Sequence, residues 1–355
     1  MSDLVERIAA AKKQVESLKK QVESAQAEKL NGFEGLNTKA SNIPNLGPTP
    51  KVRRTLRGHF GKVYAVHWSG DSEHLLSASQ DGKLMIWNGL TTNKIQSIPL
   101  ASSWVITCAY EQSANRLVAC GGMDNICSLY KVERGGQNKV VRVAQELSGH
   151  HGYLSSCSFI DETNILTASG DSTCNLWDIE RGRPIRIFKE HTADVMSVSV
   201  SKVDPTLFLS GSCDTTTKLW DIRSPNRSIL TLRGHTSDVN SVHFFPDGYG
   251  VGTGSDDRTC KFFDTRCLSM MSSFGNESIV AAITSVSFSK SGRFLFGGYE
   301  DHTIRVWDIF ADPTSPASCR SHLTGHENRV SSLSINPAGD ALLTGSWDTM
   351  LRIWA

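Results

Sequence analysis

"LSGSCDTTTKLWDIR", from Leu209 to Arg223, reads as two short β-strands joined by a tight turn. Asp214 stands in the turn, six residues ahead of Trp220, with Ser210 in the first strand and His191 upstream. Serine, histidine and aspartate are the groups of a nucleophilic catalytic triad. The stretch therefore poses a choice between a catalytic site and a structural hydrogen-bond network.

The rest of the chain bears on that choice, because the pattern occurs seven times. An aromatic residue recurs every 43 to 47 residues: Trp87, Tyr130, Trp177, Trp220, Phe263, Trp307 and Trp354. An aspartate stands six residues before each one: Asp81, Asp124, Asp171, Asp214, Asp257, Asp301 and Asp348. A histidine lies 27 to 29 residues ahead of five of these aromatics: His59, His150, His191, His235 and His326. A set that recurs so regularly is typical of a structural network, so we interpret these histidines and aspartates as structural.

The repeat also predicts the architecture. Each unit is long enough for four short strands, and seven such units are typical of a β-propeller whose blades close into a ring. The chain ends on the third strand of its last unit, at Trp354, so a strand near Arg53 to Arg57 is expected to complete that blade. The sequence therefore predicts an all-β, seven-bladed propeller over residues 51–355.

The composition argues against several classes of function. Thirty-seven basic and thirty-six acidic residues give a formal net charge of +1, so no overall field favours nucleic acid or an anionic membrane. The nine cysteines form no C-x-x-C pair, which favours buried free thiols over a zinc site or a disulfide framework. The sequence has no P-loop, G-x-S-x-G or H-E-x-x-H motif and no run of eighteen apolar residues. We expect a soluble, unsecreted protein without a metal or cofactor.

Residues 1–30 belong to a different kind of segment, because residues 2–29 contain no glycine or proline and are rich in Ala, Glu, Lys and Gln. This pattern predicts a helix. Apolar residues spaced alternately by four and three form the a/d seam of a coiled coil with one partner helix: Leu4, Ile8, Ala11, Val15, Leu18, Val22 and Ala25. The alternatives are a helix folded back along its own propeller and self-association of the chain. Residues 31–50 are rich in Gly and Pro and are predicted to be a linker.

Some residues depart from the repeat where each outer strand leads to the inner strand of the next blade. They are Lys62, Tyr64, Trp104, Ile106, Tyr153, Asp194, Met196, Asp238, Asn240 and Arg329. The turn residue ahead of the repeated aspartate adds Met123, Cys213, Asp256 and Trp347. We expect all these loops on one face of the ring, where aromatic, Met and charged side chains are typical of a protein-binding surface. Ordinary packing within the ring is the alternative for an aromatic such as Trp104.

The Gly-His to Trp-Asp repeat resembles the WD40 family, and several strings make the match closer. RRTLRGH (53–59), SASQDGKL (77–84), VACGGMDNICS (118–128), ITSVSFSKSGR (283–293) and LTGSWD (343–348) resemble the β subunits of heterotrimeric G proteins. The resemblance runs from residue 1 to the end. It implies an obligate dimer with a prenylated γ subunit, whose helix would occupy the seam from Leu4 to Ala25. It also implies reversible capture of a GDP-bound α subunit, binding of effectors and receptor complexes, and peripheral attachment to the cytoplasmic face of the plasma membrane through lipidated partners, with a cytosolic pool.

The resemblance extends the α- and effector-binding surface to the side of the first blades: Phe60, Lys83, Met85, Asn93, Lys94 and Asn125. Four positions depart from the residues usual in animal members, because Phe60, Ile106, Met123 and His151 replace Leu, Met, Leu and Thr. VERGGQNK at 132–139 also lengthens a loop. Two other classes stay open: a constitutive WD40 scaffold of another pathway, and a propeller enzyme. The enzyme would need a non-repeating polar set at the ring axis, which we do not find in the sequence.

Overall fold

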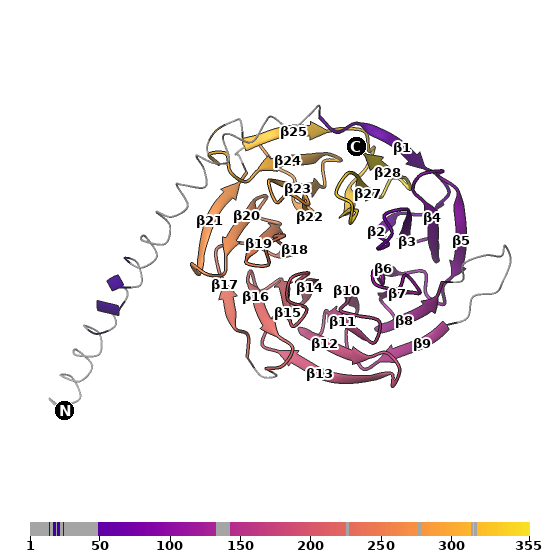
Figure 1. The fold of residues 1–355 in the computed structure, drawn as a ribbon, viewed down its shortest axis with the longest axis horizontal. Coiled ribbons are helices and arrows are strands. Elements are labelled where there is room, and N and C mark those ends of the chain that lie inside the picture. The colour runs from indigo at the N-terminus through magenta and orange to yellow at the C-terminus, as the bar shows by residue number, and fades with distance from the viewer. Residues whose placement is uncertain are drawn as a thin grey trace.

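A computed structural model describes residues 49–132, 143–224, 227–275, 278–313, 315 and 318–355, together with six residues of the N-terminal segment. Within these residues, 28 strands form seven four-stranded sheets arranged as blades around a central axis (Figure 1). The predicted all-β, seven-bladed propeller is confirmed. The a/d seam of the predicted coiled coil lies outside the described residues, apart from Leu18, whose side chain is exposed, and so does the predicted linker up to residue 48.

The strands follow one another from the ring axis outward in each blade. Blade 1 holds β2 (Val63–Trp68), β3 (His74–Ser79), β4 (Lys83–Asn88) and β5 (Lys94–Pro99). Blade 2 holds β6 (Val105–Tyr110), β7 (Leu117–Gly122), β8 (Ile126–Lys131) and β9 (Val143–Ser148). Blade 3 holds β10 (Leu154–Phe159), β11 (Asn164–Ser169), β12 (Thr173–Asp178) and β13 (Arg183–Lys189). Blade 4 holds β14 (Val195–Val200), β15 (Leu207–Ser212), β16 (Thr217–Asp221) and β17 (Leu230–Leu232). Blade 5 holds β18 (Val239–Phe244), β19 (Gly250–Ser255), β20 (Cys260–Asp264) and β21 (Ser269–Phe274). Blade 6 holds β22 (Ile283–Phe288), β23 (Phe294–Tyr299), β24 (Ile304–Asp308) and β25 (Cys319–Leu323).

Blade 7 is built from both ends of the propeller sequence. It contains β26 (Val330–Ile335), β27 (Leu342–Ser346) and β28 (Leu351–Trp354), and its outer strand is β1 (Val52–Leu56) from the start of the propeller. β1 pairs antiparallel with β28, with Leu56 opposite Leu351, and the backbones of Lys51 and Ala355 exchange two hydrogen bonds of 3.2 Å. The strand expected near Arg53 to Arg57 therefore does complete the last blade.

The hydrophobic core lies between neighbouring blades. Between blades 3 and 4, for example, Phe188 packs against Phe208 with ring centroids 4.9 Å apart, and both contact the indole of Trp220. Glycines on the second strands let the next blade approach: a Cβ on Gly211 would lie 2.7 Å from a methyl group of Val242. Burial of these aromatic and aliphatic faces holds the ring together, because a four-stranded blade alone would leave both faces in water.

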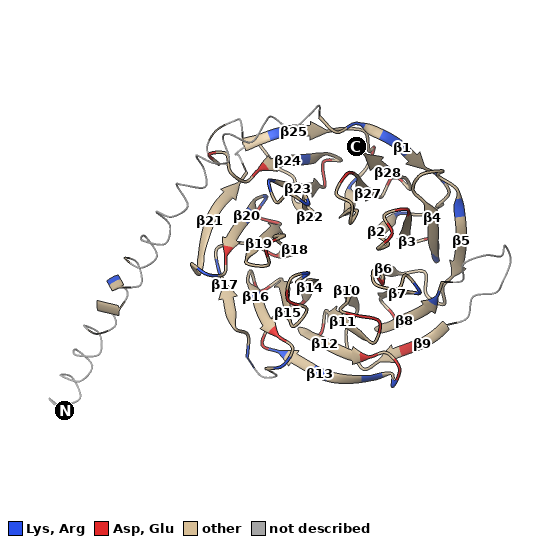
Figure 2. Cartoon of the chain, viewed as in Figure 1, with Lys and Arg blue, Asp and Glu red and all other residues tan. Residues whose placement is uncertain are grey.

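Cysteines and charges agree with the composition. All nine cysteines are free; seven are buried, and Cys213 and Cys319 are partly buried. Basic and acidic residues are distributed around the whole ring rather than gathered on one side (Figure 2). Among the described residues, no helix is both long and apolar enough to cross a membrane.

Candidate functional site

The stretch around Asp214 forms a chain of side-chain hydrogen bonds inside blade 4. His191 donates from Nδ1 to Oδ2 of Asp214 over 2.7 Å, and its Nε2 accepts from the hydroxyl of Ser210 over 2.7 Å. The indole Nε1 of Trp220 donates to the same hydroxyl oxygen over 2.8 Å. Burial removes water as a hydrogen-bond partner, and these bonds replace it for each polar group in the chain.

The aspartate also fixes its own turn. Oδ1 of Asp214 accepts from the backbone N–H and hydroxyl of Thr216, and Oδ2 accepts from the N–H of Thr192. Burial alone would raise the pKa of Asp214, but hydrogen bonds from His191 and Thr216 outweigh it and hold the pKa well below its usual value. The next residue, Thr215, has a φ of 67°, so the turn adopts a left-handed conformation that these bonds stabilise.

The same chain of hydrogen bonds occurs in blades 1, 3 and 7, with the hydroxyl supplied by Ser77, Thr167 and Thr344 respectively. In blade 5 His235 links Asp257 and Thr253, and Phe263 replaces the indole. The hydroxyl of Ser210 is 0% exposed and already bonded to both neighbours, so no substrate reaches it. This geometry supports the structural interpretation of the repeated histidines and aspartates.

Blade 6 lacks the histidine and uses other side chains. Arg305 donates from Nη2 to Oδ2 of Asp301 over 2.7 Å, and its guanidinium lies 4.2 Å above the ring of Tyr299. Trp307 donates from Nε1 to the hydroxyl of Tyr299 over 3.2 Å. Gly297 stands where five of the other blades have a serine or threonine, and the ring edge of Tyr299 lies 3.1 Å from where its Cβ would be. A tyrosine and an arginine therefore replace the serine and the histidine.

The two rows of non-repeating residues lie side by side. In every blade the turn residue donates its backbone N–H to the carbonyl of a residue in the loop that enters the inner strand. The pairs include Met123 with Trp104 (3.0 Å), Cys213 with Asp194 (2.9 Å), Asp256 with Asp238 (3.0 Å) and Trp347 with Arg329 (3.0 Å). Since all inner strands start at the same end of the ring, these pairs form one face, which we call the rim face.

A cation–aromatic cluster spans blades 1 and 7 on the rim face. Two cations lie over the ring of Trp347: Nζ of Lys62 is 4.1 Å from its centroid, and the guanidinium of Arg329 is 5.0 Å from it. Tyr64 meets the same ring edge-on at 5.8 Å. Burial raises the pKa of Tyr64, and the charge of Arg329 partly opposes that rise. Cation–π contact of this kind holds large side chains in place before a partner arrives.

An acidic group occupies blades 3 to 5 of the rim face. The hydroxyl of Tyr153 donates to Asp194 over 2.8 Å and lies 3.5 Å from the sulfur of Met196. Asn240 donates to Asp256 and to the carbonyl of Ile283. Burial and the neighbouring Asp238 raise the pKa of Cys213 to about 12, so this side chain is a neutral thiol and not a reactive thiolate.

The first two blades carry three large, exposed apolar side chains of the rim face. Phe60 is 84% exposed, Met123 59% and Trp104 51%. Nζ of Lys83 lies 5.7 Å from the ring of Phe60. Exposed apolar groups gathered in this way are typical of surfaces that bind another protein.

The structure also corrects and extends the predicted set. Met85 is only 3% exposed and packs in the core between blades 7 and 1 with Val63 and Leu351, so it is not part of the surface. Asn93 and Lys94 are exposed on the outer side of blade 1, where Lys94 donates to the carbonyl of Gly58, and Asn125 is half-buried in the turn after Asp124. Ile106 is half-buried at the start of the inner strand of blade 2.

Two rim residues were missed from the sequence. Glu300 precedes Asp301 in the turn of blade 6 and forms an ion pair with Arg329 over 2.9 Å, and Val280 is 78% exposed in the loop before β22. The sixth unit lacks Gly-His, so its loop had no marker for alignment. Glu300 could have been found from its position directly before the repeated aspartate.

The described residues contain no group of three or more His, Cys, Asp or Glu side chains that could hold a metal ion. The rim face therefore has the chemistry of a protein-binding surface: aromatic rings, methionines, and charges of both signs held by neighbouring side chains.

Comparison with known proteins agrees with this geometry. The family described as G protein beta WD-40 repeat protein matches residues 5–355. A guanine nucleotide-binding protein subunit beta of Dictyostelium discoideum is 50% identical over 359 residues, covering 100% of this chain and 99% of the relative. Relatives with the same description in Lymnaea stagnalis and Solanum tuberosum are 48% and 42% identical, covering 97% and 100% of this chain and 98% and 97% of the relatives. The chain therefore belongs to the G protein β family of WD-40 repeat proteins.

Proposed function

We propose that this chain, as the β subunit of a heterotrimeric guanine nucleotide-binding protein, captures the GDP-bound α subunit on the rim face. The observation that carries the proposal is the exposure of Trp104, Met123 and Phe60 on the same face as the ring of Trp347, over which Lys62 and Arg329 lie. Exposed aromatic anchors beside fixed charges supply most of the binding energy in protein interfaces.

The charges of the rim face orient the α subunit. Lys62, Lys83 and Arg329 belong to blades 1 and 7, whereas Asp194, Asp238 and Asp256 belong to blades 4 and 5. A partner that presents acidic groups to the first set and basic groups to the second docks in one orientation, because the reverse places like charges together. Electrostatic complementarity therefore fixes orientation, while the apolar anchors on blades 1 and 2 supply affinity.

The γ subunit binds elsewhere, along the N-terminal seam from Leu4 to Ala25. A seam of a/d residues with charged flanks leaves its apolar stripe in water unless a second helix covers it. The dimer is obligate in this proposal. Its attachment to the cytoplasmic face of the plasma membrane comes from lipid carried by its partners, since the chain has a net charge of only +1.

Effectors use the same rim face, so α and effector exclude each other. Exchange of GDP for GTP changes the surface of α and releases the rim face, and the propeller itself does not need to change shape. Signalling by this chain then requires only that the existing rim face becomes free to bind an effector.

The experiment is a competition titration with the full-length chain co-expressed with a γ-type helical polypeptide. We expect the chain to be poorly soluble alone and soluble with γ, and excess GDP-bound α to displace an effector fragment from the dimer. A Val15→Asp variant is the matched control for the seam, because a charge at that position abolishes γ-dependent rescue. A monodisperse chain without γ, or a ternary complex in which α and effector both contact the rim face, contradicts the proposal and favours a constitutive scaffold.

A further inference from the structure

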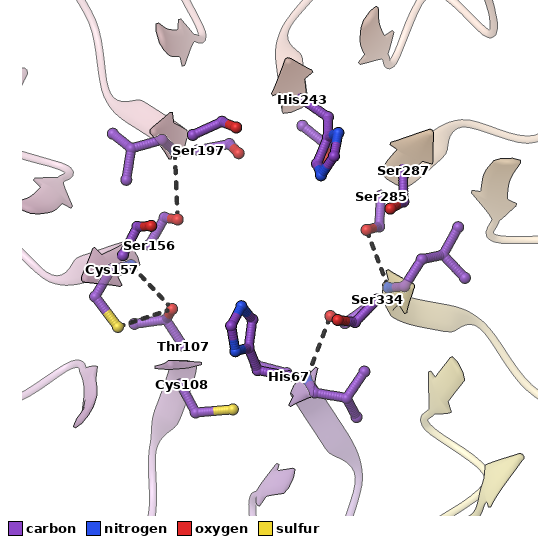
Figure 3. Close-up of a pocket in the computed structure, with 18 of the residues that line it drawn as sticks. His67, Thr107, Cys108, Ser156, Cys157, Ser197, His243, Ser285, Ser287 and Ser334 are labelled. Carbon is purple, nitrogen blue, oxygen red and sulfur yellow. Dashed lines mark hydrogen bonds between the residues drawn. The ribbon is translucent and has the colours of Figure 1, made fainter. Parts of the chain in front are cut away.

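A cavity of about 580 Å³ runs along the ring axis and is lined by the inner strands of all seven blades. Its size falls within the range of about 300–1,000 Å³ that is usual for small-molecule sites. The lining is arranged in tiers because every inner strand has the same register. The third residue of each inner strand forms one tier and the fifth residue forms the next. Figure 3 shows these side chains converging on the axis.

The third-residue tier is a ring of hydroxyl groups that link neighbouring blades. Six of its seven members carry a hydroxyl, namely Thr107, Ser156, Ser197, Ser241, Ser285 and Ser332. Each hydroxyl oxygen accepts a backbone N–H from the inner strand of the next blade, as Ser241 does from Val286 over 3.0 Å and Ser285 from Leu333 over 3.1 Å. With its oxygen used in this way, each serine hydroxyl keeps an O–H that can donate, whereas the hydroxyl of Thr107 also contacts Sγ of Cys157 over 3.5 Å.

Blade 1 breaks this tier, because its third residue is Ala65. Its fifth residue, His67, links blade 1 to blade 2 in the next tier, where the backbone N–H of Tyr110 donates to Nδ1 of His67 over 3.2 Å, as Phe244 and Trp68 donate to Ser199 and Ser334. An N–H can only donate, so the neutral ring carries its proton on Nε2. His67 therefore presents an N–H donor to the cavity.

His243 is the fifth residue of blade 5 and has the opposite tautomer. Its Nδ1 donates to the carbonyl of Phe244 over 2.9 Å, which leaves a lone pair on Nε2. Blades 1 and 5 are three steps apart in a ring of seven, so the two rings face the axis from nearly opposite sides (Figure 3). Burial, and then the positive charge of Lys202, lower the pKa of both histidines to about 4, so both are neutral near pH 7.

The charged side chains that line the cavity are Glu111, Asp161, Lys202 and Arg329. Glu111 is occupied by the backbone N–H groups of its own turn, among them those of Ala114 and Arg116. Asp161 is likewise occupied by Thr163 and Asn164, and Arg329 is paired with Glu300. Lys202 is an exposed residue just after β14, and among the described residues the structure gives it no ion pair. Its positive charge reaches the cavity, because it lowers the pKa of both histidines.

We propose that this cavity binds a small tetrahedral oxoanion that carries a proton, with hydrogen phosphate as the type. The hydroxyl tier, Nε2–H of His67 and the ammonium group of Lys202 supply donors to the anionic oxygens. Nε2 of His243 accepts from the hydroxyl group of the ligand. A fully ionised oxoanion such as sulfate has no proton for His243 and binds less well, because a lone pair would then face a lone pair. The set does not repeat around the ring, unlike the hydrogen-bond chains within the blades.

Two sources share this chemistry: inorganic phosphate, and the phosphate group of a small monoester at a pH below its second pKa of about 6, where it still carries a proton. Calorimetric titration at about pH 5.5 of the full-length chain in its dimer with γ, using inorganic phosphate, glycerol phosphate and sulfate at one ionic strength, distinguishes them. Saturable binding of either phosphate compound, with sulfate weaker, supports the proposal, and the tighter of the two identifies the source. Equal affinity for sulfate, or no saturable binding of either phosphate compound, overturns it.

Variants locate the site. His67→Asn keeps an acceptor for Tyr110 but has no donor at the position of Nε2, and Lys202→Gln removes the charge. Each is expected to weaken phosphate binding about tenfold, since a hydrogen bond to a charged group contributes on that scale. Lys290→Gln is the matched control, a nearby lysine that does not line the cavity. Phosphate affinity that is unchanged in both cavity variants, or that falls equally in the Lys290 variant, places the anion elsewhere and overturns the proposal.

Discussion

Blade 4 and blade 2 share the same four-stranded topology, yet they hold their turn aspartates differently. In blade 4, Asp214 is bonded to His191 and Thr216 and is linked through Ser210 to Trp220. In blade 2, Asp124 is exposed, and within the described residues its carboxylate accepts one hydrogen bond given by the structure, from the N–H of Ile126 over 3.3 Å. The hydrogen-bond chain is thus not required to form a blade.

The same difference shows which of the two blades serves stability and which serves binding. Ser102 stands at the place of the histidine in blade 2, and Cys120 and Tyr130 replace the serine and the tryptophan. The loop is not anchored by an imidazole, and it carries Trp104, half exposed beside Met123. Blade 4 uses the same loop to complete a buried network. The blade without the network is therefore the one that presents the largest apolar anchor of the rim face.

The largest expected effect comes from removing the turn aspartate in each of these blades. Asp214→Ala leaves His191 and the N–H of Thr216 without their acceptor and is expected to lower the free energy of unfolding by about 1–3 kcal/mol. Asp124→Ala removes one exposed contact and is expected to change it by less than about 0.5 kcal/mol. Urea unfolding of the two variants beside the wild type measures the difference. Equal losses would show that the two aspartates play the same part.

A smaller effect is expected in blade 6, which replaces the network with other residues. Tyr299→Phe removes the hydroxyl that accepts from Nε1 of Trp307 and is expected to lower the free energy of unfolding by about 1 kcal/mol. Tyr249→Phe, at a tyrosine that is 51% exposed, is the matched control and is expected to change it by less than about 0.5 kcal/mol. Thermal unfolding of both variants checks the prediction, and an unchanged Tyr299→Phe protein would mean that the Tyr299 hydroxyl contributes nothing to blade 6.

The smallest expected effect is the change with pH in the destabilisation caused by Asp214→Ala. The folded-state pKa of Asp214 lies below the value of about 3.9 for an unfolded chain, so its ionised form stabilises the fold above that pH. The stabilisation is lost as the pH falls through the folded-state pKa. The difference in unfolding free energy between wild type and Asp214→Ala should thus be constant from pH 5 to 7 and shrink below pH 4. A difference that grows in acid would reverse the assigned sign.

The sequence predicted the ring, its closure and most of the rim face, because these follow from period and position. The aspartate six residues before each aromatic identified every blade, and the missing fourth strand of the last unit indicated β1. Burial was harder to predict: Met85 stands between Leu84 and Ile86 in β4, and resemblance alone does not show which way its side chain points. Val280 was missed because blade 6 has no Gly-His marker, whereas Glu300 could have been found from its place directly before Asp301.

The polar residues that line the axial cavity were missed for a different reason. VYAVHW (63–68) and VNSVHF (239–244) place His67 and His243 at the same position of two inner strands, and the alignment was visible in the sequence. Their tautomers depend on hydrogen bonds to Tyr110 and Phe244, and those come from the arrangement of neighbouring strands. The sequence places both histidines in the fifth-residue tier, but the tautomer of each ring follows only from the packing of the neighbouring strands.

The central claim is that the rim face captures α while the networks within the blades hold the fold. The most direct measurement is a titration of GDP-bound α into dimers that carry Trp104→Ala or Asp214→Ala, with the melting temperature of each dimer recorded alongside. We predict that Trp104→Ala weakens α binding by at least about tenfold and leaves the melting temperature and γ association near wild type. We predict that Asp214→Ala lowers the melting temperature and leaves α affinity near wild type at temperatures where the dimer is folded. Unchanged α affinity in the Trp104 variant, or loss of binding in a folded Asp214 variant with an unchanged melting temperature, would contradict the account.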